Sequence, residues 1–479
     1  MKARTLLLTA FASLGATRAT SAQTIPRSCD IELPPGTSTT ANIRSTPSGA
    51  RVTYLGRGVL ARCIGQGNTL TADSAEYYES EARLYLVGHV HYTEPRVSVD
   101  AQTMTYYQND NHLHAEGNVV GVLPNGSIFR GPSADYYRAT VDRPLARMYG
   151  PGRPTVTLVQ KDTTGRGRPP DTAHVVANQI NMIGDSLVYA AGRVQITRPD
   201  LTASGDSAFM DSGSEFARLM RGPSVQGKGN RPFTLTGEVI DLYSHNRQLE
   251  RVVATPKGHA LSQDLELVAD SIDLRVQNNE LQRAIAWGPT RAHAVSPERE
   301  IVADSIDAIM PGQRIREVRA LRNAYAESTP DSGVISTQRD WMRGDTIIAR
   351  FDTLPTGDTT GKPKIRQIVA EGHARSFYQM KSSRGPANEP TVNYVRGRVI
   401  DIAFADRKVA TVTVSEQAAG VLIEPAEASS ATTPAAGTSP PSTGPRPTGT
   451  ASPGKPAPTN TPPPAGKSPS PTKPPPGVP

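Results

Sequence analysis

The sequence predicts an all-β protein built as a long stack of antiparallel strands, and three observations support this prediction. A two-part unit recurs along most of the chain, and apolar and polar residues alternate within each part, as in strands with one buried face. Gly and Pro account for 41 and 42 of the 479 residues, which favours turns and extended chain over helices. Because a small recurring unit cannot bury its apolar face alone, neighbouring units are expected to stack.

Residues 1–22 are predicted to be a secretory signal peptide. Lys2 and Arg4 supply positive charge, an apolar stretch follows, and the small residues Thr20 and Ala22 suit cleavage. No later segment approaches the roughly 18 apolar residues of a membrane helix. We therefore expect an exported, soluble, periplasmic protein, with possible association with the outer membrane.

An N-terminal arm rich in Pro, Thr and Ser is predicted over residues 23–50. The sequence contains two cysteines, Cys29 and Cys63. In an exported protein, a disulfide between them is the simplest expectation, and it would tie the arm to the first repeat.

One half of the recurring unit is an apolar run followed by Asp, often as Asp-Ser. The Asp marks occur at Asp73, Asp100, Asp135, Asp206, Asp270, Asp304 and Asp345, and Asn178, Glu238 and Arg398 take the place in weaker copies. Short polar side chains of this kind bond local backbone amides. We expect them at a corner opposite the one formed by the other half of the unit.

The other half is an apolar run that ends in Gly, a polar residue, and Val or Ala. The Gly is expected to mark a bend in the strand. Apolar residues at alternate positions in both halves should face the interior, where they line either an open lipid groove or a closed core. These are Leu84, Leu86, Val90, Leu113, Ala115, Val119, Val188, Ala190, Val194, Ile196, Val268, Ile272 and Ile368.

The repeats are assigned to two successive regions, residues 51–230 and 231–415. From residue 425 to 479 the composition changes to Pro, Ser, Thr, Ala and Gly. Such a segment cannot bury apolar surface, so a disordered tail is expected, either passive or serving as a spacer.

The paired halves resemble the OstA-like (organic solvent tolerance-like) family, which includes the β-jellyroll of LptA and the N-terminal domain of LptD. The resemblance is carried by "TADSAEYY" at residues 71–78 and "LYLVGHVHY" at residues 84–92. It returns in "LHAEGNVVGV" at residues 113–122 and "GPSADYY" at residues 131–137.

This resemblance implies an open, V-shaped jellyroll whose dry groove carries the acyl chains of lipopolysaccharide. It also implies lipopolysaccharide or another lipid as ligand, and as partners the other jellyroll components of a bridge across the envelope. The chain departs from the family in its longer repeat region, in a Pro-rich tail where LptD continues into a barrel, and in lacking a membrane helix of the LptC kind.

Motifs with catalytic potential are weak. Gly184-Asp185-Ser186-Leu187 spells an esterase signature, but the accompanying Asp171-x-x-His174 precedes it instead of following it. Asp-Ser recurs at several corners, so a structural role explains it better than a nucleophile that needs an oriented base. We expect no enzymatic activity and no cofactor.

Two histidine pairs, His89-x-His91 and His112-x-His114, would each share one face of a strand. Pairs on adjacent strands can bind zinc, but solvated histidines are the commoner case, and no metal site is assigned. The net charge of +7 is spread along the chain, without a basic cluster interleaved with aromatics, so nucleic acid is not an expected partner.

The expected function is lipid binding and transfer of the lipopolysaccharide-transport and outer-membrane-assembly type, with edge-to-edge self-association at the terminal strands. Two alternatives stay open: a structural or adhesion β-solenoid with a closed core, and a polysaccharide-active β-helix enzyme that uses two carboxylates.

Overall fold

The computed structural model describes residues 31–34, 40–160, 171–229, 231–262, 265–296, 299–330, 333–352, 363–382, 389–405 and 408–425. The chain divides into two units, Met1–Ala428 and Ser429–Pro479, and all described residues belong to the first. The predicted signal peptide, Cys29 and the predicted tail after Pro425 lie outside the described residues.

The described part consists of strands and two short 3₁₀ helices. The first strands are β1 (Ile31–Glu32), β2 (Thr40–Ser45), β3 (Arg51–Gly56), β4 (Val59–Cys63), β5 (Thr69–Ala72), β6 (Ser74–Tyr78), β7 (Arg83–Glu94), β8 (Val97–Tyr107), β9 (His112–Val122), β10 (Ile128–Tyr137), β11 (Arg147–Pro151), β12 (Thr155–Gln160), β13 (Asp171–Val176), β14 (Gln179–Ile183), β15 (Leu187–Thr197) and β16 (Leu201–Asp211). They continue as β17 (Phe216–Met220), β18 (Ser224–Gly227), β19 (Thr234–Thr236), β20 (Val239–His245), β21 (Gln248–Thr255), β22 (Gly258–Leu261), β23 (Glu266–Ala269), β24 (Ser271–Gln277), β25 (Glu280–Ser296), β26 (Arg299–Ile309), β27 (Glu317–Ser328), β28 (Asp340–Phe351), β29 (Ile365–Met380), β30 (Thr391–Ala405), β31 (Lys408–Ser415) and β32 (Ala419–Ile423). The 3₁₀ helices are η1 (Glu79–Glu81) and η2 (Pro311–Gln313).

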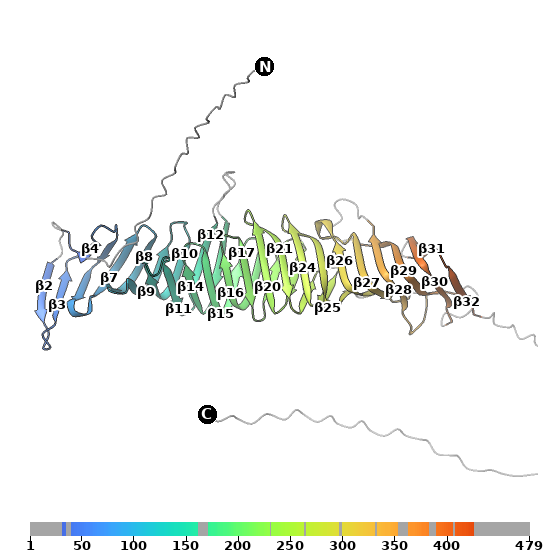
Figure 1. Cartoon of the computed structure of the whole chain (residues 1–479), viewed down its shortest axis with the longest axis horizontal. Helices are drawn as coiled ribbons and strands as arrows, with labels where there is room; N and C mark the ends of the chain where they lie inside the picture. Colours follow the sequence, from blue (N-terminus) through green and yellow to red (C-terminus); the bar gives the residue numbers. More distant parts are fainter. Residues whose placement is uncertain are drawn as a thin grey trace, which may run out of the picture. The chain divides into compact units, whose positions relative to one another are not determined.

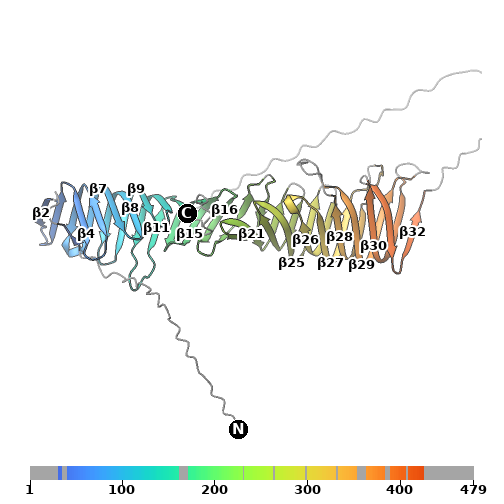
Figure 2. The same ribbon diagram turned by 90° about the horizontal axis from the view of Figure 1, so that it is seen from above.

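The strands follow one another along a single continuous antiparallel stack (Figures 1 and 2), which confirms the predicted all-β, jellyroll-like class. Pairing continues from β18 through β19 to β22, so the stack is unbroken between the two predicted repeat regions. No helix among the described residues is long and apolar enough to cross a membrane.

Each level of the stack consists of one long strand or of two short strands in succession. The chain bends once at each level, and these bends divide the sheet into two walls. In β7, residues 83–87 pair with β6, whereas residues 90–94 belong to the part that pairs with β5. We call the β6 side, which includes β11, β14, β20 and β24, wall 1. The β5 side, which includes β12, β13, β19 and β23, is wall 2. The walls are joined by the chain along one edge, the seam. At the other edge each wall ends in a rim of turns, and the gap between the rims is the mouth.

Most crossings from wall 1 to wall 2 use two successive residues in the left-handed region. Gly88 and His89 have φ of 79° and 46°, and Gly372 and His373 have φ of 73° and 50°. The strand register shifts at these points, between Val87 and Val90 in β7. The predicted bend at Gly is therefore confirmed, and glycine is favoured there because it adopts positive φ without steric cost.

Most of the Asp marks lie at this same seam, which corrects the expectation of an opposite corner. Asp73 donates its backbone N–H to the Gly88 carbonyl oxygen at 2.9 Å, and its carboxylate lies 2.9 Å from Nδ1 of His89. Asp345 is likewise 3.2 Å from Nδ1 of His373. Most crossings from wall 2 back to wall 1 thus place a polar side chain over the neighbouring bend, which is why both halves of the unit recur together. At the β10 crossing, Pro132 lies beside Gly152 instead.

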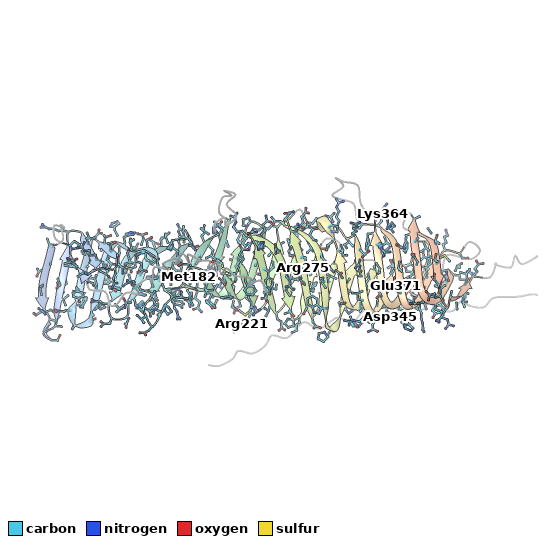
Figure 3. All side chains as sticks on the ribbon, turned by 45° about the horizontal axis from the view of Figure 1, so that its top comes forward. Met182, Arg221, Arg275, Asp345, Lys364 and Glu371 are labelled. Carbon is cyan, nitrogen blue, oxygen red and sulfur yellow. The ribbon has the colours of Figure 1, made fainter. Side chains whose placement is uncertain are left out.

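In Figure 3 the labelled seam residues Arg221 and Asp345 lie along the lower margin of the stack, and Lys364, beside a wall-1 turn, lies along the upper margin.

Not every Asp mark reaches the seam. Asp100 is bonded to His91 at 2.7 Å, and Gln102 takes the seam place beside Gly117. Asp135 lies on wall 1 between histidines.

Alternate residues face the space between the walls and form one continuous core. The predicted inward residues are buried at 5% exposure or less, except Ile368, which is half-buried, and Val268. Val268 is 42% exposed and faces outward, so its assignment was wrong. The chain crosses the seam at Asp270, and the alternation changes phase there: Leu267 and Ala269 face inward before the crossing, as Ile272 does after it.

Part of the predicted arm is strand. β2 pairs with β3, and β1 pairs with β4, where Ile31 lies opposite Cys63. Cys63 is disulfide-bonded. Its pairing with Cys29, the other cysteine of the sequence, stays a prediction.

The seam predicts that Gly88→Ala is destabilising by about 1–3 kcal/mol, because alanine resists positive φ. In addition, its Cβ would lie 2.2 Å from Asp73 Oδ2. Urea unfolding measures the change. Gly56→Ala is the matched control, since a Cβ there meets only Thr40 Oγ1 at 3.6 Å. Equal stability of the two variants would contradict the assigned role of the seam.

Candidate functional site: the mouth between the walls

The interior differs along its length, and polar bridges across the mouth mark the part that is closed. The first bridge centres on Arg138, which follows β10 on the wall-1 rim and is 2% exposed. Its guanidinium donates to Glu94 Oε2 at 3.0 Å and to Gln66 Oε1 at 3.0 Å, both on the wall-2 rim. A further donation goes to Asn111 Oδ1 on wall 1 at 3.2 Å. This side chain therefore ties the two rims together.

Tyr136 strengthens the same bridge by donating its hydroxyl to Glu94. Burial, and then the nearby Glu94 carboxylate, raise the pKa of Tyr136 far above its usual value, so the phenol stays protonated and remains a donor. The Glu94 carboxylate is buried, and it accepts hydrogen bonds from both Tyr136 and Arg138.

A second bridge is made by Arg198 in the β15–β16 turn of wall 2. Its guanidinium donates to Ser244 Oγ and to the Arg247 carbonyl oxygen, both at 3.0 Å, on the wall-1 rim. Asp200 holds the same guanidinium with two bonds of 3.0 and 2.9 Å.

Single hydrogen bonds also span the mouth. Asn125 Nδ2 on wall 2 donates to the Asp185 carbonyl oxygen on wall 1 at 3.2 Å. Arg231 Nη1 donates to the Gln313 carbonyl oxygen at 3.5 Å. Along the stack, the bond between Arg231 and Gln313 is the last of the bridges described above.

An apolar cavity of about 310 Å³ begins where the bridges end. It lies between β25–β30 of both walls, and its volume is in the range of small-molecule sites. Wall 1 contributes mainly aliphatic and aromatic side chains: Ile315, Val318, Ile347, Ala349, Phe351, Ile365, Ile368, Ile402 and Phe404. Wall 2 adds the apolar and aromatic residues Leu265, Ala294, Val295, Ile301, Ala326, Trp341, Met342, Phe377 and Tyr378, together with the polar residues Ser296, Arg299, Glu327, Ser328, Asp340 and Ser376.

The polar side of the cavity is held by bonds within wall 2. Glu327 pairs with Arg339 at 2.6 Å, and Asp340 Oδ1 accepts from the Gln379 backbone N–H at 2.9 Å. The cavity thus combines an apolar surface, formed by both walls, with fixed polar groups on wall 2. Such a surface suits an amphiphile.

The sequence located this site only in part. Of the predicted lining residues, Ile368 borders the cavity. Leu84, Val119 and Val194 instead belong to the packed core at 1% exposure each. Alternation predicts which residues face inward, but not whether the facing wall fills the space between them. The signal in the sequence was the pair of large apolar residues Ile347 and Phe351, which lie at alternate positions on either side of the small Ala349.

The motifs considered for chemistry lie apart from the cavity. Asp185 lies in a wall-1 turn and makes a mouth bridge, and His174 lies on β13 beside Thr157. His112 and His114 both contact Asp135 Oδ1 at 2.8 Å on wall 1. Within the described ranges, no group of three or more His, Cys, Asp or Glu side chains is arranged to hold a metal ion.

Comparison with known proteins found one weak structural similarity. No protein-family model matches the chain, and no curated protein matches it. Among solved structures, the chain is similar to LptH, described as the LptA-homologous periplasmic component of the lipopolysaccharide transport device of Pseudomonas aeruginosa. The two are 15% identical over 33% of this chain and 83% of that chain, with a TM-score of 0.17. A superposition this weak carries no argument about the present chain, and family membership is not shown.

The first bridge predicts that Arg138→Met costs about 3–5 kcal/mol of unfolding free energy, because it leaves Glu94 buried without its cation. The double variant Arg138→Met/Glu94→Gln should recover part of that loss, since no unpaired charge remains. Chemical denaturation of both variants measures the difference. A double variant less stable than the single one would contradict the ion-pair assignment.

His114 predicts a pH dependence of stability. Its partial burial alone would lower its pKa, but hydrogen bonds to Asp135 and Glu116 outweigh burial and raise the pKa above 6.5. The protonated form therefore stabilises the fold below the unfolded-state value, and this contribution is lost as pH rises through the folded-state pKa. His114→Gln should flatten the unfolding free energy over that pH window. An unchanged pH profile would contradict this assignment.

Proposed function

We propose that this protein is a non-enzymatic lipid carrier of the exported compartment, of the lipopolysaccharide-transport type. The observation that supports the proposal is the apolar cavity between β25 and β30, which opens where the mouth bridges stop. An acyl chain would lie against Ile347 and Ile368, and a polar headgroup would meet the wall-2 rim. Burial of each methylene contributes roughly 0.8 kcal/mol, so no cofactor or bond-forming step is needed.

Lipopolysaccharide is the proposed cargo, and its identity rests on the sequence resemblance of the repeats. The periplasmic location rests on the predicted signal peptide. Support for assembly with similar β-proteins comes from the ends of the stack, where β2 pairs only with β3, and β32 only with β30, among the described strands. Such free edges can pair with another chain, either another bridge component or a second copy of this one.

A structural spacer is the second candidate, and a specific observation favours it. From Val59 to Ala286 the interior is packed, and polar bridges close the mouth. In this alternative the long stack separates partners and the cavity has no ligand.

The carrier proposal predicts that filling the cavity abolishes amphiphile binding. Ala349→Trp places an indole in the cavity, since Ala349 is a lining residue at 3% exposure. Titration with a fluorescent fatty acid should show at least a tenfold loss of affinity. Val268→Trp, on an outward position that is 42% exposed, is the matched control and should bind as the unsubstituted chain does.

A photo-crosslinking amino acid distinguishes lipopolysaccharide from other amphiphiles in cells. Placed at Ile347 or Ile368, it should capture lipopolysaccharide, whereas the same group at Val268 should not. Capture at none of these positions, together with unaltered fatty-acid binding by Ala349→Trp, would leave the spacer as the function.

A further inference from the structure

The outer face of wall 2 carries a row of arginines without acidic partners. Arg343, Arg375 and Arg396 are direct neighbours across β28, β29 and β30. All three are exposed. Within the described part of the chain, none forms an ion pair. Like charges directly opposite each other on a sheet are destabilising, so the fold alone gives no reason for this row.

A second row on the outer face of wall 1 shows how the same pattern is normally neutralised. Arg251, Arg275 and Arg283 are also direct cross-strand neighbours. There, Asp273 lies 2.9 Å from both Arg251 and Arg275, and Asp307 lies 2.7 Å from Arg283. The wall-2 row therefore differs from its counterpart in lacking the intervening acids.

Aromatic side chains occupy the neighbouring positions on wall 2. Trp341 stacks on Phe377 with ring centroids 6.1 Å apart and meets Tyr394 edge-on at 6.2 Å. The guanidinium of Arg343 lies over the Trp341 ring at 5.2 Å. Val421 on β32 lies opposite Tyr394 and is 56% exposed. The face thus pairs an apolar, aromatic row with a cationic row.

We infer that this face, defined by Arg343, Arg375, Arg396, Trp341, Phe377 and Tyr394, docks on a membrane surface rich in anionic phospholipid. Three unneutralised guanidinium groups are complementary to phosphate headgroups. Trp and Tyr beside cationic side chains suit the boundary between headgroups and acyl chains. The exposed apolar end of the row at Val421 favours a lipid surface over a purely polar polyanion.

This docking goes beyond the proposed carrier function, and its arginine row takes no part in the cavity. Trp341 and Phe377 also border the cavity, so docking would bring its wall-2 rim close to lipid. The Arg row itself faces away from the interior.

The test is flotation of the mature chain with vesicles of phosphatidylcholine containing phosphatidylglycerol, against vesicles of phosphatidylcholine alone. Binding should require phosphatidylglycerol and weaken with salt. Arg375→Gln should lower affinity roughly fivefold, and the triple variant R343Q/R375Q/R396Q roughly a hundredfold, at about 1 kcal/mol per arginine. Arg275→Gln, the centre of the neutralised row, is the matched control and should leave affinity unchanged.

Equal losses for Arg375→Gln and Arg275→Gln would overturn the inference, because net charge and not the defined face would then cause binding. Binding to a soluble anionic glycan such as polygalacturonate, without binding to vesicles, would overturn it as well. Thermal melts establish whether each variant is folded. If the triple variant is not folded, Trp341→Ser tests the apolar row in its place. Ala349→Trp should retain vesicle binding, which separates failure of the docking from failure of the carrier proposal.

Discussion

The architecture depends on one constraint, the two-residue left-handed bend at the seam and the polar side chain that covers it. At Gly88 and His89 the strand leaves wall 1 and enters wall 2, and Asp73 from the preceding crossing bonds both residues. Because the bend uses a conformation that most residues avoid, the sequence supplies Gly at most of these crossings, although Arg322 and Asn323 make the one in β27. Repeating this bend keeps two walls facing each other over the whole stack.

Two facing walls joined at one edge leave the other edge to be closed by side chains. Arg138 spans this mouth with an ion pair and Arg198 with hydrogen bonds, at places where the interior is filled. Buried pairs of this kind add little net stability but are costly to break, so they fix the spacing of the rims. Beyond Gln313 the walls enclose a cavity.

The outer faces follow a different rule from the interior, because they are constrained by charge and not by volume. On wall 1, Asp273 and Asp307 neutralise a row of arginines. On wall 2, the equivalent row around Arg375 lies beside aromatic rings instead. Since the backbone pairing is the same in both rows, the contrast arises from the side chains alone. It is the kind of local conflict that often marks a functional surface.

The sequence by itself determined the all-β class, the repeating unit, the bend at Gly and the inward direction of most apolar residues, because these depend on local periodicity and backbone preference. It misplaced Val268, since the phase of alternation changes at Asp270, and it separated the Asp mark from the Gly bend, which residues on neighbouring strands bring together. Only the tertiary structure decided where the interior is filled and where it is open. That outcome depends on the summed volumes of facing side chains and on contacts such as Arg138 with Glu94, which join residues far apart in the sequence and leave no local pattern.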